Sequence, residues 1–101
     1  MFEREFREAF HATVEEAKKI MERATASTAS VEIQIRNGAR FDIASIEKND
    51  AGDYDVKKNY AATSEGEFDG LFISDDVAAS YVPYSEISVL FASIIPAEQE
   101  N

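Results

Sequence analysis

The sequence contains no cysteine, which excludes disulfide bonds, thiolate metal sites and cysteine nucleophiles. Histidine occurs once, as His11, and we expect it on the surface of a helix rather than in a catalytic set. No glycine-rich phosphate loop is present. No apolar run approaches the roughly 20 residues that span a membrane, and the charged N-terminus lacks the apolar core of a signal peptide. These absences predict a cytoplasmic protein with no enzymatic activity, no cofactor and no membrane partner.

Basic residues are absent from the second part of the chain. Residues 1–58 hold all ten Lys and Arg and twelve of the twenty acids, whereas residues 59–101 hold eight acids and no Lys or Arg. The formal net charge is −10. Because affinity for a phosphate backbone comes largely from cations that displace counterions, bulk charge disfavours nucleic-acid binding. Any such site must use the basic residues of the first part.

The length and the periodicity together predict one domain over residues 1–101. Within it we expect an N-terminal helix in residues 1–26, a β-barrel in residues 31–95 and a frayed tail in residues 96–101. The fold class that follows is mainly β with an N-terminal α-helix.

Residues 2 to about 26 predict an amphipathic helix. The side chains of the stripe recur every three or four residues, at Phe2, Phe6, Phe10, Val14 or Thr13, Ala17, Ile20 or Met21, and Ala24. This stripe indicates a helix that packs on its own sheet, with packing on a neighbouring subunit as the alternative. The small polar residues "TASTAS" that follow predict a linker or a fraying helix end.

The period changes to two at Val31, where apolar and polar residues begin to alternate up to Arg36. Asn37-Gly38 predicts a two-residue hairpin turn with positive φ at both positions. The return strand slips out of alternation after Ile43, which predicts a β-bulge near Ala44–Ser45.

Further strands are expected over residues 54–62, 68–74, 77–82 and 88–95. Gly70 lies inside one of them, which indicates a close approach of another backbone. Pro83 is expected at a strand end, because it cannot donate to a ladder. The residues Tyr84-Ser85-Glu86 then predict a single 3₁₀ turn that re-aims the chain into the last strand.

The succession of a helix, "VEIQIRNGARFDI", a bent hairpin, "GLFIS" and "YVPYSEISVLF" resembles the Sm-like (LSm) family. That resemblance implies a small, strongly bent, five-stranded antiparallel SH3-like barrel. Ile43 stands where the family usually has Gly, and Lys48, Asn49 and Asp50 do not reproduce the spacing of its uracil-binding residues. Val82-Pro83-Tyr84 replaces the Arg-Gly pair that many members carry. The chain would be a divergent member, of the kind associated with phage or environmental genomes.

The resemblance also implies a homo-oligomer, a closed ring of about five to seven subunits in which the last two strands pair between neighbours. Residues 77–82 and 88–95 carry almost no charge, and an edge built from them would otherwise be unprotected. The subunit contacts expected are Val77, Ala79, Tyr81, Val82, Ile87, Val89 and Phe91. The alternatives are an interior strand pair in a monomeric barrel, or a barrel that pairs with one partner strand.

The stretch "YDVKKNY" places Lys57 and Lys58 between two tyrosines, a mixture of cations and rings that favours single-stranded nucleic acid. The residues expected to bind RNA are Arg36, Arg40, Lys48, Asn49, Lys57 and Lys58, repeated around the ring. The alternative is that these lysines merely solubilise a loop and that the oligomer is a scaffold for protein partners. The acidic turns around Asp50 and Asp75 indicate solvated loops rather than metal sites.

Overall fold

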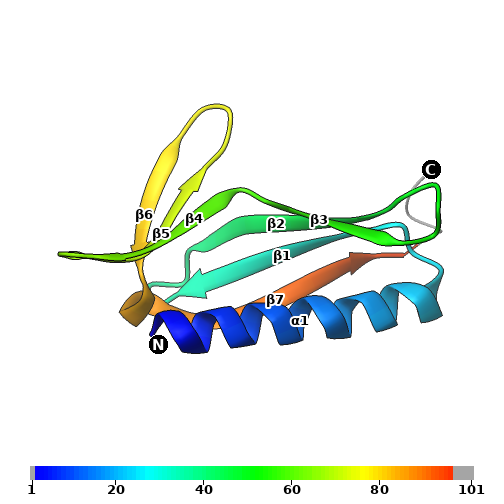
Figure 1. Cartoon of the computed structure of the whole chain (residues 1–101), viewed down its shortest axis with the longest axis horizontal. Helices are drawn as coiled ribbons and strands as arrows, with labels where there is room; N and C mark the ends of the chain where they lie inside the picture. The colour runs from blue at the N-terminus through cyan, green and yellow to red at the C-terminus, as the bar shows by residue number, and fades with distance from the viewer. Residues whose placement is uncertain (1, 97–101) are drawn as a thin grey trace.

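The computed structural model describes residues 2–96, which form one α-helix, seven β-strands and one 3₁₀ turn (Figure 1). The elements in chain order are α1 (Glu3–Ala24), β1 (Thr28–Ile35), β2 (Arg40–Lys48), β3 (Tyr54–Lys58), β4 (Tyr60–Glu65), β5 (Phe68–Ser74), β6 (Ala79–Pro83), η1 (Tyr84–Glu86) and β7 (Ile87–Ile95). The expectation of a mainly β fold with an N-terminal helix is confirmed.

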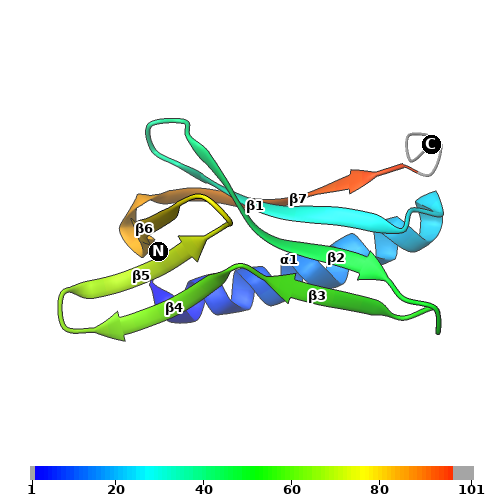
Figure 2. The same ribbon diagram turned by 90° about the horizontal axis from the view of Figure 1, so that it is seen from above.

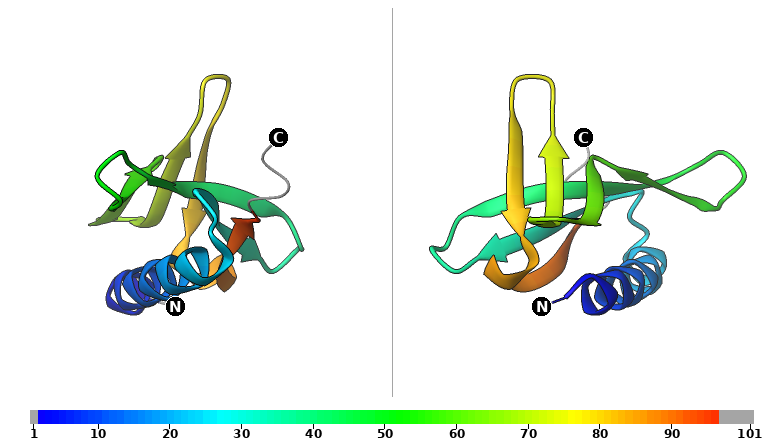
Figure 3. Two further views of the ribbon diagram at one scale, coloured as in Figure 1. Left: turned by 90° about the vertical axis from the view of Figure 1, so that its right-hand side faces the viewer. Right: turned by 60° about the vertical axis from the view of Figure 1, so that its left-hand side comes forward.

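Within these residues the strands form two antiparallel sheets, one in the order β3-β2-β1-β7 and the other in the order β4-β5-β6. The described strands number seven, where five were expected, and both sheets are open at their edges. The helix runs along one face of the four-stranded sheet, and the β5–β6 hairpin stands away from it (Figures 1 and 3).

The helix packs on the chain's own sheet, as the apolar stripe predicts. Its buried residues are Phe6, Phe10, Val14, Ala17 and Met21. Phe2, which the stripe also includes, is 71% exposed because it lies just before the first helical turn. The helix ends at Ala24, and the residue that caps it, Thr25, has a left-handed φ of 54°. The Ala26 N–H then donates to the Met21 carbonyl oxygen at 2.8 Å. This closing geometry leads the chain directly into β1.

The prediction of a linker after the helix is wrong, because β1 begins at Thr28 rather than at Val31. Thr28 pairs with Glu47 of β2 on one side and with Ile95 of β7 on the other. Ala26 and Ala29 are buried there. Small side chains are needed because the end of the helix and the sheet approach each other closely, so a pattern that looks like a linker is part of the core.

The first hairpin turn differs from the prediction at one position. Gly38 has a φ of 91°, but Asn37 keeps a negative φ. The Gly38 N–H donates to the Ile35 carbonyl oxygen at 2.9 Å, and the Ile35 N–H donates to Ala39 at the same distance. These bonds define a three-residue loop with a glycine bulge rather than a two-residue turn.

A β-bulge interrupts β2, one residue before the predicted position. Val31 pairs with Ala44, but the next residue of β1 pairs with Asp42, so Ile43 is the extra residue. Ile43 and Ala44 are both buried. The bulge restores the buried face that the slip in alternation would otherwise lose.

The strand predicted over residues 54–62 is two strands, which break at Asn59. β3 pairs with β2 in the four-stranded sheet, whereas β4 pairs with β5 in the three-stranded sheet. Figure 2 shows β3 and β4 following one another along the same side of the molecule. One stretch of chain therefore belongs to both sheets and joins them.

The expectations around the proline are confirmed, except at the tip of the preceding hairpin. Pro83 ends β6, and Tyr84–Glu86 form the 3₁₀ turn that leads into β7. Val77, expected in a strand, lies in the turn between β5 and β6 instead. Gly70 of β5 faces β6 so closely that a Cβ atom there would meet the Val82 carbonyl oxygen and would lie 2.7 Å from the Pro83 Cα.

Candidate functional site

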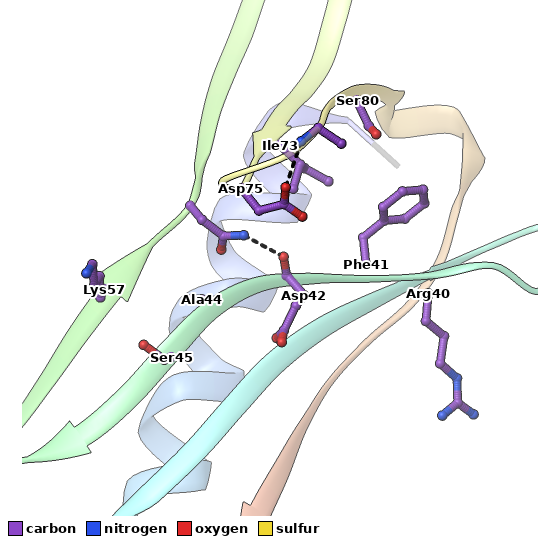
Figure 4. Close-up of a pocket in the computed structure, with 11 residues that line it drawn as sticks. Arg40, Phe41, Asp42, Ala44, Ser45, Lys57, Ile73, Asp75 and Ser80 are labelled. Atoms are coloured by element: carbon purple, nitrogen blue, oxygen red, sulfur yellow. Dashed lines mark hydrogen bonds between the residues drawn. The ribbon is translucent and has the colours of Figure 1, made fainter.

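A cleft of about 450 Å³ lies where the two sheets meet, and we call it the inter-sheet cleft. It is lined by β2, β3, Asn59, β5, the β5–β6 turn and β6 (Figure 4). The polar side chains that line it are Arg40, Asp42, Ser45, Lys57, Asn59, Asp75 and Ser80. Cations and carboxylates are therefore mixed in this cleft.

Asn59 holds the back of the inter-sheet cleft together. Its backbone N–H donates to the Ile43 carbonyl oxygen at 2.9 Å, and its side-chain amide donates to the Asp42 carbonyl oxygen at 2.8 Å. Its own carbonyl oxygen accepts from the Ser74 N–H of β5 at 3.0 Å. The residue at the strand break thus ties the β2 bulge of one sheet to the end of β5 in the other.

The Asp42 carboxyl stands beside another acid. Asp42 pairs with Glu32 across the β1–β2 ladder. Partial burial raises the pKa of Asp42, and the Glu32 carboxylate raises it further. The Ser93 hydroxyl of β7 donates to Glu32 at 3.3 Å. This corner of the sheet is acidic and disfavours a phosphate group.

Two of the six residues expected to bind RNA border the inter-sheet cleft. Lys57 lines it, and Arg40 lies at its rim. The Arg40 guanidinium lies 5.4 Å from the centroid of the Phe91 ring. Figure 4 shows Arg40 and Phe41 leaving β2 on opposite sides, with Arg40 directed away from the cleft. Lys57 is therefore the cation best placed to meet a ligand in the cleft.

The other four residues of that set lie elsewhere. Arg36 is in the β1–β2 turn, where its backbone N–H donates to the Glu86 carbonyl oxygen at 3.1 Å. Lys48 and Asn49 lie at the opposite end of β2. The Asn49 side-chain oxygen accepts from the Ala51 and Asp53 N–H groups at 3.0 Å, so Asn49 shapes its turn.

Lys58 lies in a second hollow, a groove of about 610 Å³ between α1 and the β3–β4 stretch. Its Nζ is 5.4 Å from the centroid of the Phe10 ring and 5.9 Å from that of Tyr60. Burial, with a smaller contribution from Tyr84, raises the pKa of Tyr60 to about 12. Lys57 and Lys58, adjacent in sequence, thus line different hollows because successive side chains of a strand point to opposite faces.

Some of the residues expected at a subunit interface are instead buried in the core of the chain. Val82 and Ile87 are buried within the chain itself. Val77, at the tip of the β5–β6 turn, is 92% exposed, and Val89 of β7 is 43% exposed. Ala79 is exposed, whereas Tyr81 and Phe91 are half-buried. An interface between copies could therefore use these five side chains but not Val82 or Ile87.

The acidic turns are explained locally. The Asp75 carboxylate accepts from the Val77 N–H at 2.9 Å and from the Ala78 N–H at 2.8 Å, and these bonds lower its pKa. Within residues 2–96 no group of three or more acidic or histidine side chains is arranged to hold a metal ion. In the same part of the chain, no helix is both long and apolar enough to cross a bilayer.

Sequence reasoning missed Asn59 and an exposed aromatic cluster on β5 and β6. Asn59 ends a run of three polar residues, Lys57 to Asn59, and this interruption of the apolar-polar alternation is the local signal that could have marked the break. The cluster does have a signal, since "FDGLFIS" is apolar on both faces of a strand: Leu71 and Ile73 are buried, while Phe68 and Phe72 are largely exposed. A strand that is apolar on both faces has a second apolar surface to cover.

In comparisons with known proteins, no protein-family model, no curated protein and no solved structure matches this chain. The function of the chain therefore has to be inferred from the geometry described above.

Proposed function

We propose that this chain is a non-enzymatic assembly module that pairs with copies of itself through the edges of β6 and β7. The observation that carries this proposal is the lack of charge on these two edges. Neither Ala79–Pro83 nor Ile87–Ile95 contains an Asp, Glu, Lys, Arg or His. Within residues 2–96, β6 pairs with β5 alone and β7 with β1 alone, so each has a free side.

The other two sheet edges carry charge, although unevenly. β3 carries Asp55, Lys57 and Lys58, whereas β4 has a single charged residue, Glu65, at its end. Charged side chains on an edge strand discourage pairing with another chain. The contrast between charged and uncharged edges supports β6 and β7 as the pair that meets across a subunit boundary, with each molecule offering one edge to each neighbour.

Such head-to-tail pairing closes into a ring if the rotation between neighbouring subunits returns to the first copy, and it grows into a filament if it does not. Within this proposal the chain is a divergent Sm-like protein, located in the cytoplasm, that forms a ring of about five to seven subunits. The two sheets would be the halves of an open SH3-like barrel, with corners at Asn59 and η1. The 3₁₀ turn between the last two strands supports that assignment.

The test is the mass of the native protein, measured by native mass spectrometry and by light scattering, for the wild type and two lysine variants. Val89→Lys places a charge on the β7 edge, and Ala61→Lys places the same charge on exposed β4 as a matched control. We expect one closed oligomer for the wild type and Ala61→Lys, and a monomer with an unchanged circular dichroism spectrum for Val89→Lys. A wild type that stays monomeric at high micromolar concentration would contradict assembly.

RNA binding is the second candidate, and the position of Lys57 in the inter-sheet cleft favours it. In a ring this cation would be repeated around the axis, so weak contacts would add up. Binding of labelled single-stranded RNA should then weaken steeply with salt and be lost in Lys57→Glu with Lys58→Glu. If the wild-type ring carried no RNA, RNA binding would be rejected and only the scaffold function would remain.

A further inference from the structure

Three aromatic side chains form an exposed cluster on the three-stranded sheet, and we call it the aromatic face: Phe68, Phe72 and Tyr81. Phe72 pairs with Tyr81 across the β5–β6 ladder, and Phe68 lies on the same side of β5 because it is four residues away. Ring centroids are 5.0 Å apart for Phe72 and Tyr81, 5.5 Å for Phe68 and Tyr81, and 5.7 Å for Phe68 and Phe72.

The aromatic face is accessible, and a hydrogen bond anchors one of its rings. Phe68 is 44% exposed and Phe72 is 43% exposed, so their rings present large apolar areas to solvent. The Tyr81 hydroxyl accepts a hydrogen bond from the Asp69 N–H at 2.8 Å, which fixes the third ring. Exposed apolar patches of this kind mark interaction sites, and rings that are already ordered lose little entropy when a partner binds.

The charge around the aromatic face has one sign. Glu65 pairs with Phe68 across the β4–β5 ladder, and Glu67 directly precedes that ring in the chain. Within residues 2–96 no ion pair joins Glu65 or Glu67 to a cation. No Lys or Arg occurs beyond residue 58. The aromatic face therefore combines ring faces with unpaired carboxylates.

Basic side chains of this chain lie over aromatic rings outside the aromatic face. Arg40 lies over Phe91, and Lys58 lies over Phe10 and Tyr60. In the part of the chain that the structure describes, no cation lies over a ring of the aromatic face. Ring faces attract Arg and Lys side chains, and carboxylates at the rim add a second attraction for the same cations.

We propose that the aromatic face binds a basic, extended peptide segment of a partner protein, whose Arg or Lys side chains lie on Phe68 and Phe72 and reach Glu65 and Glu67. The carboxylates repel a phosphate backbone, which makes a nucleic acid the wrong occupant. The face lies on the broad side of the sheet, whereas the proposed self-assembly uses the edges of β6 and β7. A ring would thus display one peptide site on each subunit.

The test measures binding of a labelled peptide of alternating arginine and serine by fluorescence anisotropy, with an alternating glutamate-serine peptide as the charge-reversed probe. Phe72→Ala should weaken binding of the basic peptide at least about tenfold, as expected for an aromatic contact residue. Phe2→Ala removes a ring elsewhere that is even more exposed, 71% against 43% for Phe72, and should leave binding unchanged. Glu65→Gln with Glu67→Gln should weaken binding and flatten its salt dependence.

Phe72→Leu is the control for misfolding, because it keeps a large apolar side chain on β5 and removes only the aromatic ring. This variant should fold like the wild type and still lose most of its affinity for the basic peptide. The Val89→Lys variant separates the two proposals, since a chain that no longer assembles should still bind the peptide. Equal binding by Phe72→Ala and the wild type would overturn the site and leave only general attraction to an acidic protein. A change in oligomer mass in Phe72→Ala would also overturn it, because the face would then be a contact between copies.

Discussion

The Asn59 side-chain amide donates a hydrogen bond of 2.8 Å to the Asp42 carbonyl oxygen, at the point where one strand leaves the first sheet and enters the second. Its backbone N–H donates to the neighbouring Ile43 carbonyl oxygen at 2.9 Å. Two successive carbonyl groups of the bulge in β2 are thereby satisfied by one residue. The bend between the sheets and the bulge in β2 are therefore a single structural unit.

Asn59→Ala should lower the free energy of unfolding by about 0.5–1.5 kcal/mol, because the Asp42 carbonyl oxygen loses its side-chain donor at a solvent-accessible site. Asn59→Asp should be no better, since a carboxylate cannot donate. Urea unfolding measures both, with Ser45→Ala, another polar residue that lines the cleft, as the control. If Asn59→Ala unfolded with the wild-type midpoint, the side-chain bond would not hold the bend.

Gly70→Ala should be destabilising by about 1–3 kcal/mol, because the added methyl group overpacks the contact with β6. A Cβ atom there would meet the Val82 carbonyl oxygen and lie 2.7 Å from the Pro83 Cα, and neither backbone group can move independently of the ladder. Ser74→Ala, at an exposed site on the same strand, should change stability by less than about 0.5 kcal/mol. Thermal unfolding of the two variants measures this difference in stability. Equal unfolding temperatures for Gly70→Ala and Ser74→Ala would contradict the close approach of β5 and β6 at Gly70.

Thr25→Gly should stabilise the protein, by about 0.5–1 kcal/mol, because a β-branched residue with a φ of 54° is strained and glycine is not. Ala24→Gly, one residue earlier and still in the helix, should destabilise it by about 1 kcal/mol. Adjacent substitutions of the same kind are thus expected to have opposite signs. Chemical denaturation of both variants checks this, and a loss of stability in both would contradict the left-handed cap.

Stability should fall as the pH rises from about 10 to about 12, because burial raises the pKa of Tyr60 from an ordinary 10.0 to about 12. Below the lower value the phenol is neutral in both states and its contribution is intact. Between the two values the unfolded chain releases the proton first, which favours unfolding. Tyr60→Phe should flatten this decline when its unfolding midpoints are compared with those of the wild type across that range.

The helix and most strand runs follow from the sequence because they depend on local periodicity. Phe6, Phe10 and Val14 recur at helical spacing, and Phe68–Ser74 is a strand with the bounds that its apolar run predicts. The 3₁₀ turn follows from Pro83, whose missing donor requires a strand end. Each of these signals lies within a few residues of the element it specifies.

The features that the sequence did not reveal depend on contacts distant in the chain. The strand break at Asn59 is set by bonds to Asp42, Ile43 and Ser74, none of which is a near neighbour in sequence. Ala29 belongs to a stretch whose small polar residues predict a linker, but it is buried where the end of the helix approaches the sheet. The dispersal of the expected RNA-binding residues has a simpler cause, since Lys57 and Lys58 alternate along a strand and could not share one face.

The position of β1 between β2 and β7 has a consequence for how the protein is made. Its partner on one side follows it at once, but its partner on the other side is the last described strand, and Thr28 pairs with Ile95. While the ribosome extends the chain, α1 can shield the apolar side of β1. The backbone N–H and C=O groups on the β7 side of β1, however, stay unpaired until β7 has been synthesised. Pairings across such long separations form slowly and leave the nascent chain open to wrong partners. The interval before β7 emerges is therefore when the free side of β1 is most open to mispairing.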